Sequence, residues 1–262
     1  MSEYHFEVQD GIGVLTFNRP EVLNALTLEL YAEYRELLYK LQSDEQVKVL
    51  VLTGAGRAFC SGGDVHKIIG ELLDDDMRAH LEFTRMTGAV VRDMRLLDKP
   101  IIAAVNGVAA GAGAVIALAC DLRVVARSAK FSFLFTQVGL TGADMGAAYL
   151  LPRVVGMGRA AEILMLAEEI DAATAERIGL ANRVADDELL LPTALDLARK
   201  LASGPVFALS MTKRMLEREW NMDLLGALES EAQAQALMMM GQDHRSFYEA
   251  FKRKQRPEFT GR

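Results

Sequence analysis

Two segments of the chain combine a hydrophobic run, a turn of small residues and a helix-like continuation. They read LVLTGAGRAFCSGGDV, from residue 50, and VNGVAAGAGAVIALACDL, from residue 105. A tight turn at a helix start leaves backbone N–H groups pointing outward, and the helix dipole adds positive potential there. Two such groups aimed at one point would form an oxyanion hole for a carbonyl that becomes an enolate or tetrahedral anion. The alternative is two tight buried turns without chemistry.

The second segment admits two other interpretations. From Pro100 to Cys120 the chain carries 21 uncharged residues, enough for a membrane span. Asn106, three glycines and many weakly apolar alanines argue against insertion. The Gly-Ala-Gly at 111–113 is typical of a dinucleotide-binding loop, but Ile116 stands where the third glycine belongs. We therefore predict a short strand, a turn and a buried helix.

The composition is that of a globular protein. Of 262 residues, 51% are hydrophobic and 25% are charged, which argues against disorder. This length can bury a large core as one domain with a smaller appendage. The formal net charge is −7, whereas a non-specific polyanion binder would normally be basic. We therefore expect no nucleic-acid partner; only the basic C-terminal end could support RNA binding.

Cysteines and histidines give little sign of chemistry. Cys60 and Cys120 are expected to be reduced, buried thiols, the alternative being a nucleophilic role for Cys60. The four histidines show no metal-ligand spacing, so no metal site is predicted. The N-terminal residues are polar and acidic without a leader pattern, which predicts a cytoplasmic protein.

Strand-like and helix-like segments alternate along most of the chain, which predicts an α/β core with right-handed crossovers. Strands are expected in GIGVLTFNRP, VKVLVLTG, IIAAV, LRVVAR and KFSF. Thr27 is expected to cap a helix that includes Leu30, Tyr34, Leu37, Leu38 and Leu41. Further helices are predicted after Asp64, through Thr84 to Leu97, near 112–119, and from Asp171 to Gly179.

The chain changes character near Ser203. We divide it into a core over 1–203 and a helical region over 204–262, which is rich in Leu, Met and Ala. Three consecutive methionines, Met238 to Met240, are expected to supply adaptable packing in an interface.

Four segments then carry a resemblance that covers nearly the whole chain, from about Phe6 to Phe259. They are NRPEVLNAL, GAGRAFCSGGDV, KPIIAAVNGVAAGAGAVIALACDLRVVA and VGLTGADMGAAYLLPRVVG. In order and spacing the chain resembles the enoyl-CoA hydratase/isomerase (crotonase) family. The resemblance implies an α/β fold with a ββα-spiral core, and a C-terminal helical region used for trimerisation. It also implies a homotrimer or a hexamer made of two trimers, and an acyl-CoA thioester substrate.

The resemblance places the two oxyanion-hole amides on Gly63 and Ala112. It implies substrate binding by Val22, Ala25, Ala58, Ser61, Gly62, Gly63, His66, Gly111 and Ala112. His66 would line the acyl pocket, while Asp64 is predicted to be a helix N-cap. The basic end FKRKQRPEFTGR could meet the phosphates of coenzyme A or lie in solvent. No metal or redox cofactor is implied, and coenzyme A enters as part of the substrate.

The sequence departs from the family at the residues that add water. Hydratases of the family use two glutamates, at positions that this chain fills with Val115 and Phe135. Neither side chain can move a proton. Asp144 lies near the turn where single-acid members carry a working carboxylate, after an insertion of about one residue. Desolvation beside an apolar pocket would raise its pKa and suit it to act as a base. Alternatively, Asp144 caps the helix that starts near Gly146.

These observations predict an enzyme that stabilises a thioester enolate and moves a proton with Asp144. Isomerase-type or lyase-type chemistry is favoured over hydration. Thr141, Gln137 and Tyr149 could assist by hydrogen bonding. The alternative is a member of the fold that has lost its chemistry and serves as an acyl-CoA-binding protein or oligomeric scaffold. The acyl group is not predicted beyond an apolar or aromatic character.

Overall fold

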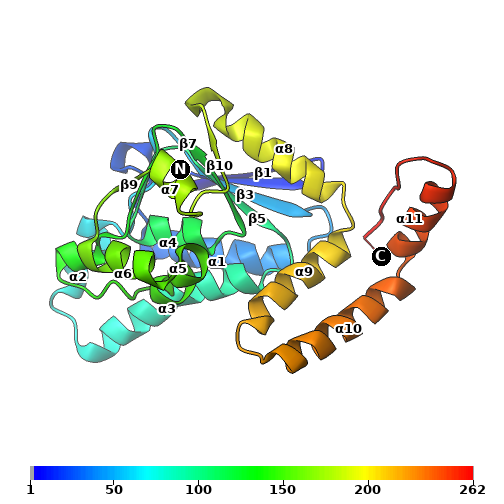
Figure 1. Cartoon of the computed structure of the whole chain (residues 1–262). Coiled ribbons are helices and arrows are strands. Elements are labelled where there is room, and N and C mark those ends of the chain that lie inside the picture. The colour runs from blue at the N-terminus through cyan, green and yellow to red at the C-terminus, as the bar shows by residue number, and fades with distance from the viewer. Residues whose placement is uncertain (1–2, 262) are drawn as a thin grey trace.

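Two β-sheets organise the computed structural model, which describes residues 3–261 (Figure 1). The larger sheet has the strand order β1-β2-β3-β5-β7-β10, and the smaller has the order β4-β6-β8-β9. In the larger sheet only the β1–β2 pair is antiparallel. The bounds are β1 Tyr4–Gln9, β2 Ile12–Phe17, β3 Val49–Gly54, β4 Ala58–Cys60, β5 Ile101–Val105, β6 Val108–Ala110, β7 Leu122–Ala126, β8 Lys130–Ser132, β9 Ile170–Asp171 and β10 Arg183–Ala185.

A repeating unit winds the chain between these sheets. β3 and β4, β5 and β6, and β7 and β8 are successive pairs, and each pair gives one strand to each sheet. This arrangement confirms the mixed α/β fold with a ββα spiral. β4 and β6 were not predicted from the sequence, because each has three residues and lies inside a glycine-rich segment. Such strands are too short to show an alternating pattern.

Helices cover the sheets and fill the space between them. Their bounds are α1 Leu28–Ser43, α2 Gly70–Leu72, α3 Met77–Leu96, α4 Ala112–Ala119, α5 Ala147–Val155, α6 Met157–Leu166, α7 Ala172–Arg177, α8 Leu190–Ala202, α9 Val206–Glu219, α10 Leu224–Met240 and α11 Gln242–Lys252. Thr27 caps α1 as predicted, because its hydroxyl accepts the Leu30 amide at 3.1 Å. The predicted helix after Asp64 is instead a wider helical turn over Val65–Ile69 that leads into α2. Among residues 3–261, no helix combines the length and hydropathy needed to cross a bilayer.

A buried lysine fastens α9 to the core. Lys213 donates to the carbonyls of Met94 (3.2 Å) and Lys99 (2.9 Å), and its Nζ lies 2.8 Å from an Asp121 carboxylate oxygen. A buried ammonium is tolerated only where its donors are satisfied and its charge is paired, as they are here. The start of the predicted helical region is therefore anchored to the core through the buried Lys213.

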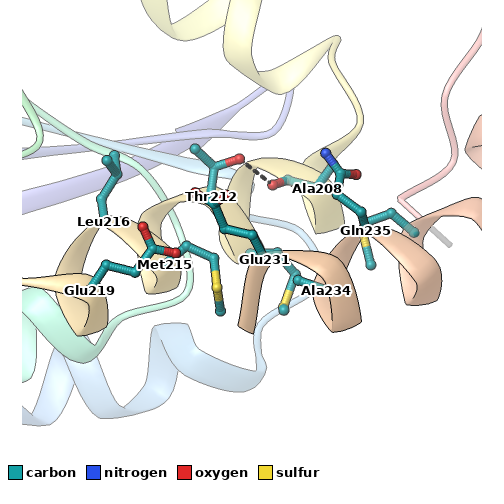
Figure 2. A pocket seen from close by; sticks show the side chains of 10 residues that line it. Ala208, Thr212, Met215, Leu216, Glu219, Glu231, Ala234 and Gln235 are labelled. Atoms are coloured by element: carbon teal, nitrogen blue, oxygen red, sulfur yellow. Dashed lines mark hydrogen bonds between the residues drawn. The ribbon is translucent and has the colours of Figure 1, made fainter. Parts of the chain in front are cut away.

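Helices α10 and α11 extend away from the core (Figure 1). α10 contains no buried residue, and large apolar side chains are exposed along both helices, including Leu225 (77%), Met240 (87%) and Phe251 (70%). A cavity of about 320 Å³ separates α9 from α10, lined by Met215, Met238 and neighbouring residues (Figure 2). These helices are incompletely packed against their own chain.

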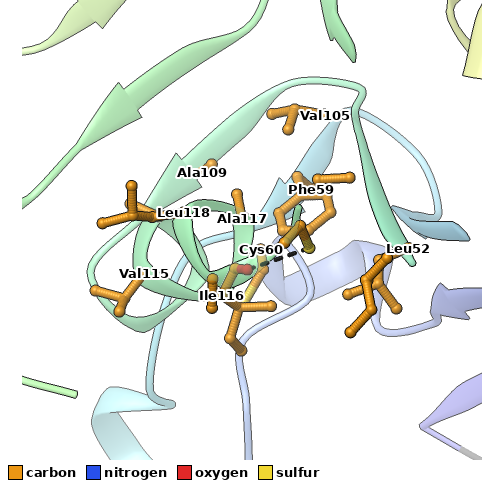
Figure 3. Packing of buried hydrophobic residues seen from close by; sticks show 14 of the residues in the cluster. Leu52, Phe59, Cys60, Val105, Ala109, Val115, Ile116, Ala117 and Leu118 are labelled. Carbon is orange, nitrogen blue, oxygen red and sulfur yellow. Dashed lines mark hydrogen bonds between the residues drawn. The ribbon is translucent and has the colours of Figure 1, made fainter. Parts of the chain in front are cut away.

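Backbone lies directly against backbone where α4 meets β4. A Cβ atom added to Gly113 would lie 2.1 Å from the Cys60 carbonyl oxygen. Figure 3 shows α4 side chains packed around Phe59 and Cys60 of β4, and all eight residues of α4 are buried. The predicted buried helix at 112–119 is confirmed, and glycine at 113 is required by contact.

Substitution of Gly113 by alanine tests this contact. Because the obstructing atom belongs to the backbone of a buried strand, Gly113→Ala should lower the free energy of unfolding by about 1–3 kcal/mol or more. The matched control is Gly88→Ala in α3, where nothing lies within 4 Å of the added carbon. Alanine there should raise stability by about 0.5–1 kcal/mol through helix propensity. Urea unfolding measures both changes, and equal effects would contradict the assignment.

Candidate active site

The two small-residue segments meet at Gly62 and Ala112. A Cβ atom added to Gly62 would lie 3.4 Å from the Ala112 nitrogen and 3.6 Å from the Gly111 Cα. Gly62 has φ +102° and Gly111 has φ +50°, conformations that side-chain-bearing residues rarely adopt. The structure therefore brings together the two segments on which the sequence analysis placed an oxyanion hole.

The direction of the Gly63 N–H is set by a hydrogen bond to the carbonyl of the same peptide group. The Gly62 carbonyl, which shares this peptide with the Gly63 N–H, accepts the Leu26 amide at 2.8 Å. In a trans peptide the C=O and N–H bonds point in opposite directions. The Gly63 N–H therefore points away from Leu26.

The Ala112 amide is oriented in a similar way by α4. The Gly111 carbonyl accepts the Val115 amide at 3.1 Å, so it points along the helix. The Ala112 N–H, in the same peptide group, therefore points out of the helix N-terminus. At the other end of α4, the buried Arg123 donates to the carbonyls of Leu118 (3.2 Å) and Cys120 (2.7 Å). The C-terminal carbonyls of α4 are thus supplied with donors, whereas the Ala112 N–H at the other end has no acceptor within residues 3–261.

Within the described part of the chain, both amides are left without an acceptor. Among the hydrogen bonds of residues 3–261, none has the Gly63 or Ala112 nitrogen as its donor. Gly63 is partly exposed and Ala112 is 6% exposed. Two adjacent segments thus each present an unpaired donor, and α4 adds positive potential at one of them. This arrangement suits an oxygen on which negative charge develops.

The predicted substrate-binding residues fall into one region. Ser61 N donates to the Leu23 carbonyl at 3.0 Å, which brings the segment of Val22 and Ala25 beside the first oxyanion segment. Val22 is exposed, whereas Ala25 and Ala58 are buried. The His66 side chain is exposed, and the buried residue next to Gly63 on this turn is Ile68. The assignment of these residues to substrate stays a prediction.

Asp64 is a helix cap, as predicted. One carboxylate oxygen accepts the amides of His66 and Lys67, each at 3.1 Å, and the other accepts Arg19 Nη2 at 3.0 Å. Burial alone would raise the Asp64 pKa, but these hydrogen bonds outweigh burial and hold it below its ordinary value. Asp64 is therefore an ionised structural residue.

Asp144 lies on the turn before α5 and does not cap that helix. The N-cap is Gly146, and no side chain bonds to the helix start. Burial raises the Asp144 pKa, partly offset by the Met145 amide. Burial raises the pKa of the Tyr31 hydroxyl, and both Cys60 and Asp144 raise it further. Asp144 is thus a partly buried carboxylate whose side chain does not bond to the start of α5.

Val115 and Phe135, which fill the two positions where the resemblance implies hydratase glutamates, are buried in the core. Val115 is 0% exposed and Phe135 is 6% exposed, and both belong to the main hydrophobic cluster. The three predicted helper residues are engaged elsewhere. Gln137 donates to the Ala167 carbonyl (2.8 Å), Thr141 accepts the Ala143 amide (3.2 Å), and Tyr149 stacks under the Arg153 guanidinium.

The structure also gives three polar residues a role at the site that was not predicted from the sequence. Asn24 and Asn106 both donate to the Ala58 carbonyl, at 2.8 and 3.1 Å, and Arg19 Nη1 donates to the Ala25 carbonyl at 2.6 Å. Asn24 is fully buried with φ +57°, a conformation that asparagine tolerates. The sequence signal was Asn24 between the apolar Leu23 and Ala25 in NRPEVLNAL, which points to a turn but not to its partner.

A nucleophilic role for Cys60 is contradicted. The thiol is fully buried, and burial raises its pKa to about 12, so no thiolate forms at neutral pH. In the described part of the chain, residues 3–261, no three His, Cys, Asp or Glu side chains are grouped so as to hold a metal ion.

Comparisons with known proteins agree on one family. A family model described as "Enoyl-CoA hydratase/isomerase" matches residues 7–262. The chain is 39% identical over 255 residues to 1,2-epoxyphenylacetyl-CoA isomerase of Escherichia coli (strain K12), covering 97% of each chain. It is 34% identical to the short-chain-enoyl-CoA hydratase of Clostridium acetobutylicum, covering 96% of this chain and 95% of that protein. A solved structure titled as a putative enoyl-CoA hydratase from Streptomyces coelicolor A3(2) is 50% identical, with a TM-score of 0.97, and the match covers 100% of this chain and 95% of that one.

The raised pKa of Asp144 predicts a pH-dependent cost in stability. The native state holds this proton more tightly than the unfolded chain does, so the stability that the group contributes is present at low pH and lost as pH rises through the raised pKa. Asp144→Asn cannot ionise and should raise the Tm at neutral pH. The gain should shrink as pH falls toward the ordinary Asp range.

Asp171 provides a control of opposite sign. Its carboxylate accepts the Thr174 amide at 2.7 Å, and this bond lowers its pKa. Asp171→Ala should therefore lower the Tm at neutral pH. Thermal unfolding across a pH series measures both variants, and a lower Tm for Asp144→Asn at neutral pH would contradict the assigned burial of that carboxylate.

Proposed function

The chain belongs to the enoyl-CoA hydratase/isomerase family, and on that premise we propose that it shifts a proton within an acyl-CoA thioester. The amides of Gly63 and Ala112 bind the thioester oxygen, and Asp144 carries the proton. Coenzyme A enters as part of the substrate, and the proposal includes no separate metal or redox cofactor.

The observation that carries the proposal is the orientation of the two free amides. Each is aimed by a hydrogen bond to the carbonyl of its own peptide group, so neither needs to move when charge develops. A thioester oxygen held by both would gain negative charge as a proton leaves the neighbouring carbon. Preorganised donors of this kind stabilise the charged state more than the neutral one.

Asp144 completes the proton balance. Its carboxylate takes a proton from the α- or γ-carbon, and the electron pair of the broken C–H bond moves toward the thioester oxygen as an enolate. The same carboxyl group returns the proton to another carbon of the chain, which shifts the double bond without gain or loss of atoms. Its raised pKa strengthens it as a base. Related enolate reactions, such as C–C or C–X cleavage, would use the same parts.

Hydration by two glutamates is disfavoured on this chain. Val115 and Phe135 fill the two positions, and both are buried and apolar. The named relatives include an isomerase and a hydratase, so their names do not decide between the reactions. The buried Val115 and Phe135 also favour a second candidate function, in which the protein binds acyl-CoA without turnover.

Deuterium exchange separates these functions. Incubation with trans-2-, cis-3- and trans-3-enoyl-CoAs and aryl-acyl-CoAs in D₂O should give deuterium incorporation or a shifted double bond by mass spectrometry and NMR. Asp144→Ala should lower the rate by about 10²–10⁴-fold, because no other proton carrier is assigned. Asp196→Asn, an exposed aspartate on α8, is the matched control and should leave the rate unchanged.

The oxyanion amide can be removed without changing a side-chain charge. Ala112 is the first residue of α4, a position where proline is tolerated and its missing N–H disturbs no helical bond. Ala112→Pro should lower kcat by about 10²–10³-fold while the Tm changes little.

Binding of acyl-CoA with no exchange in the wild type would favour the binding-only function. Exchange that survives Asp144→Ala would remove Asp144 as the base, and rapid hydration of crotonyl-CoA would overturn the isomerase assignment.

We also propose that α10 and α11 form an interface between copies of the chain, giving a homotrimer or a hexamer. The exposed Leu225, Met240 and Phe251 support this proposal, since isolated proteins rarely expose so much apolar surface on adjacent helices. Sedimentation velocity should give the mass of three or six chains. Phe251→Asp should shift the protein toward a single chain, and a monomeric wild type would contradict the assembly.

A further inference from the structure

Arg19 follows β2, and its guanidinium joins three segments that lie far apart in the sequence. Nη1 donates to the Ala25 carbonyl at 2.6 Å, and Nη2 donates to Asp64 Oδ2 at 3.0 Å. Nε lies 3.4 Å from a carboxylate oxygen of Glu3. The Arg19 side chain is 11% exposed, so these contacts are screened from water more than a surface ion pair would be.

A chain of two peptide groups connects this cation to the candidate oxyanion hole. The Ala25 carbonyl that Arg19 binds shares a peptide with the Leu26 N–H, which donates to the Gly62 carbonyl at 2.8 Å. That carbonyl shares a peptide with the Gly63 N–H. There are no cis peptides among residues 3–261, so each C=O is opposed to the N–H of its group. The two peptide dipoles therefore align head to tail, with the positive end at Gly63.

Alignment of this kind strengthens the last donor. A carbonyl that accepts a hydrogen bond is polarised, and the N–H of the same peptide becomes more positive. The first bond in this chain comes from an ionised donor, which makes it stronger than a bond between neutral groups. Arg19 thus fixes the direction of the Gly63 N–H and increases its positive charge.

The same guanidinium also offsets a negative charge. Asp64 directly follows Gly63, and its pKa is held low, so the carboxylate is ionised beside the place where an oxyanion would form. An unpaired anion there would oppose the reaction, whereas the pair with Arg19 reduces this field.

We propose that Arg19 is a positioning residue for the thioester carbonyl, acting through the Ala25–Leu26 and Gly62–Gly63 peptide groups. The inference rests on the proposed function, because it assumes that the Gly63 amide binds that carbonyl. The two amides of the oxyanion hole then receive positive electrostatic potential from different sources. The Ala112 amide draws on the dipole of α4, and the Gly63 amide draws on a side-chain cation that never touches the substrate.

Infrared difference spectroscopy measures the effect directly. The probe is hexanoyl-CoA labelled with ¹³C at the thioester carbonyl, whose stretching frequency falls as the hole polarises it. Arg19→Gln should show a smaller fall on binding than the wild type, and the rate of deuterium exchange at saturating thioester should drop about tenfold. The concentration for half-maximal rate should change little. Arg19→Lys, which keeps the charge with fewer donors, should lie between the two.

Arg35→Gln is the matched control. Arg35 also makes an ion pair, with Asp93 at 2.8 Å, but it contacts neither peptide group of the relay. Its carbonyl frequency and exchange rate should equal those of the wild type. Thermal unfolding of all variants shows whether they are folded, and Arg19→Lys carries the test if Arg19→Gln does not fold.

The double variant Arg19→Gln/Asp64→Asn separates the relay from charge neutralisation. It removes the anion along with the cation, so the fall in carbonyl frequency should stay reduced if the relay acts. A double variant restored to the wild-type frequency overturns the proposal, as does an unchanged frequency in folded Arg19→Gln or Arg19→Lys. If the wild type binds the probe without any frequency change, the oxyanion assignment itself is wrong, and the proposed function is overturned with it.

Discussion

Contact between backbone atoms of Cys60 and Gly113 is the constraint on which the site depends. It allows β4 and α4 to approach so closely that no Cβ atom fits between them. The approach sets Gly62 beside the Ala112 amide, one turn of the spiral away in sequence. A second point of closure lies at the Ala58 carbonyl, where Asn24 and Asn106 converge from two other segments. The side chains of Asn24 and Asn106 support this region, but the candidate site itself consists of main-chain atoms.

A site made of main-chain donors separates binding from reaction. The amides of Gly63 and Ala112 exist whatever side chains surround them, and in the proposed function they would bind any thioester oxygen. The fate of the resulting enolate depends on which acids and bases face it. Here Val115 and Phe135 supply none, and Asp144 stands alone on a different turn. Relatives with one fold and different named reactions fit this division of labour.

Most of the fold could be predicted because its signals are local. The hydrophobic run before Gly54, the cap at Thr27 and the spacing of Leu30 to Leu41 each specify their element without distant contacts. The segments carrying Gly63 and Ala112 were found for the same reason. The strands β4 and β6 were missed since pairing with each other, not their own pattern, makes them strands. Arg19 and Asn24 were missed because their roles depend on carbonyls brought near by folding. The alternative that Asp144 caps α5 was wrong, since Gly146 takes the N-cap position and no side chain bonds to that helix start.

The buried thiol of Cys60 can report on local opening of the structure. Its sulfur belongs to the residue whose carbonyl lies against Gly113, and burial raises the thiol pKa to about 12, so no thiolate forms at neutral pH. Because the thiol is fully buried, an alkylating reagent reaches it only when this part of the core opens locally. The rate of its modification would therefore follow local opening of the spiral at the point where the two oxyanion segments meet. The rate of Cys60 alkylation would thus measure how often the segments of the candidate site move apart.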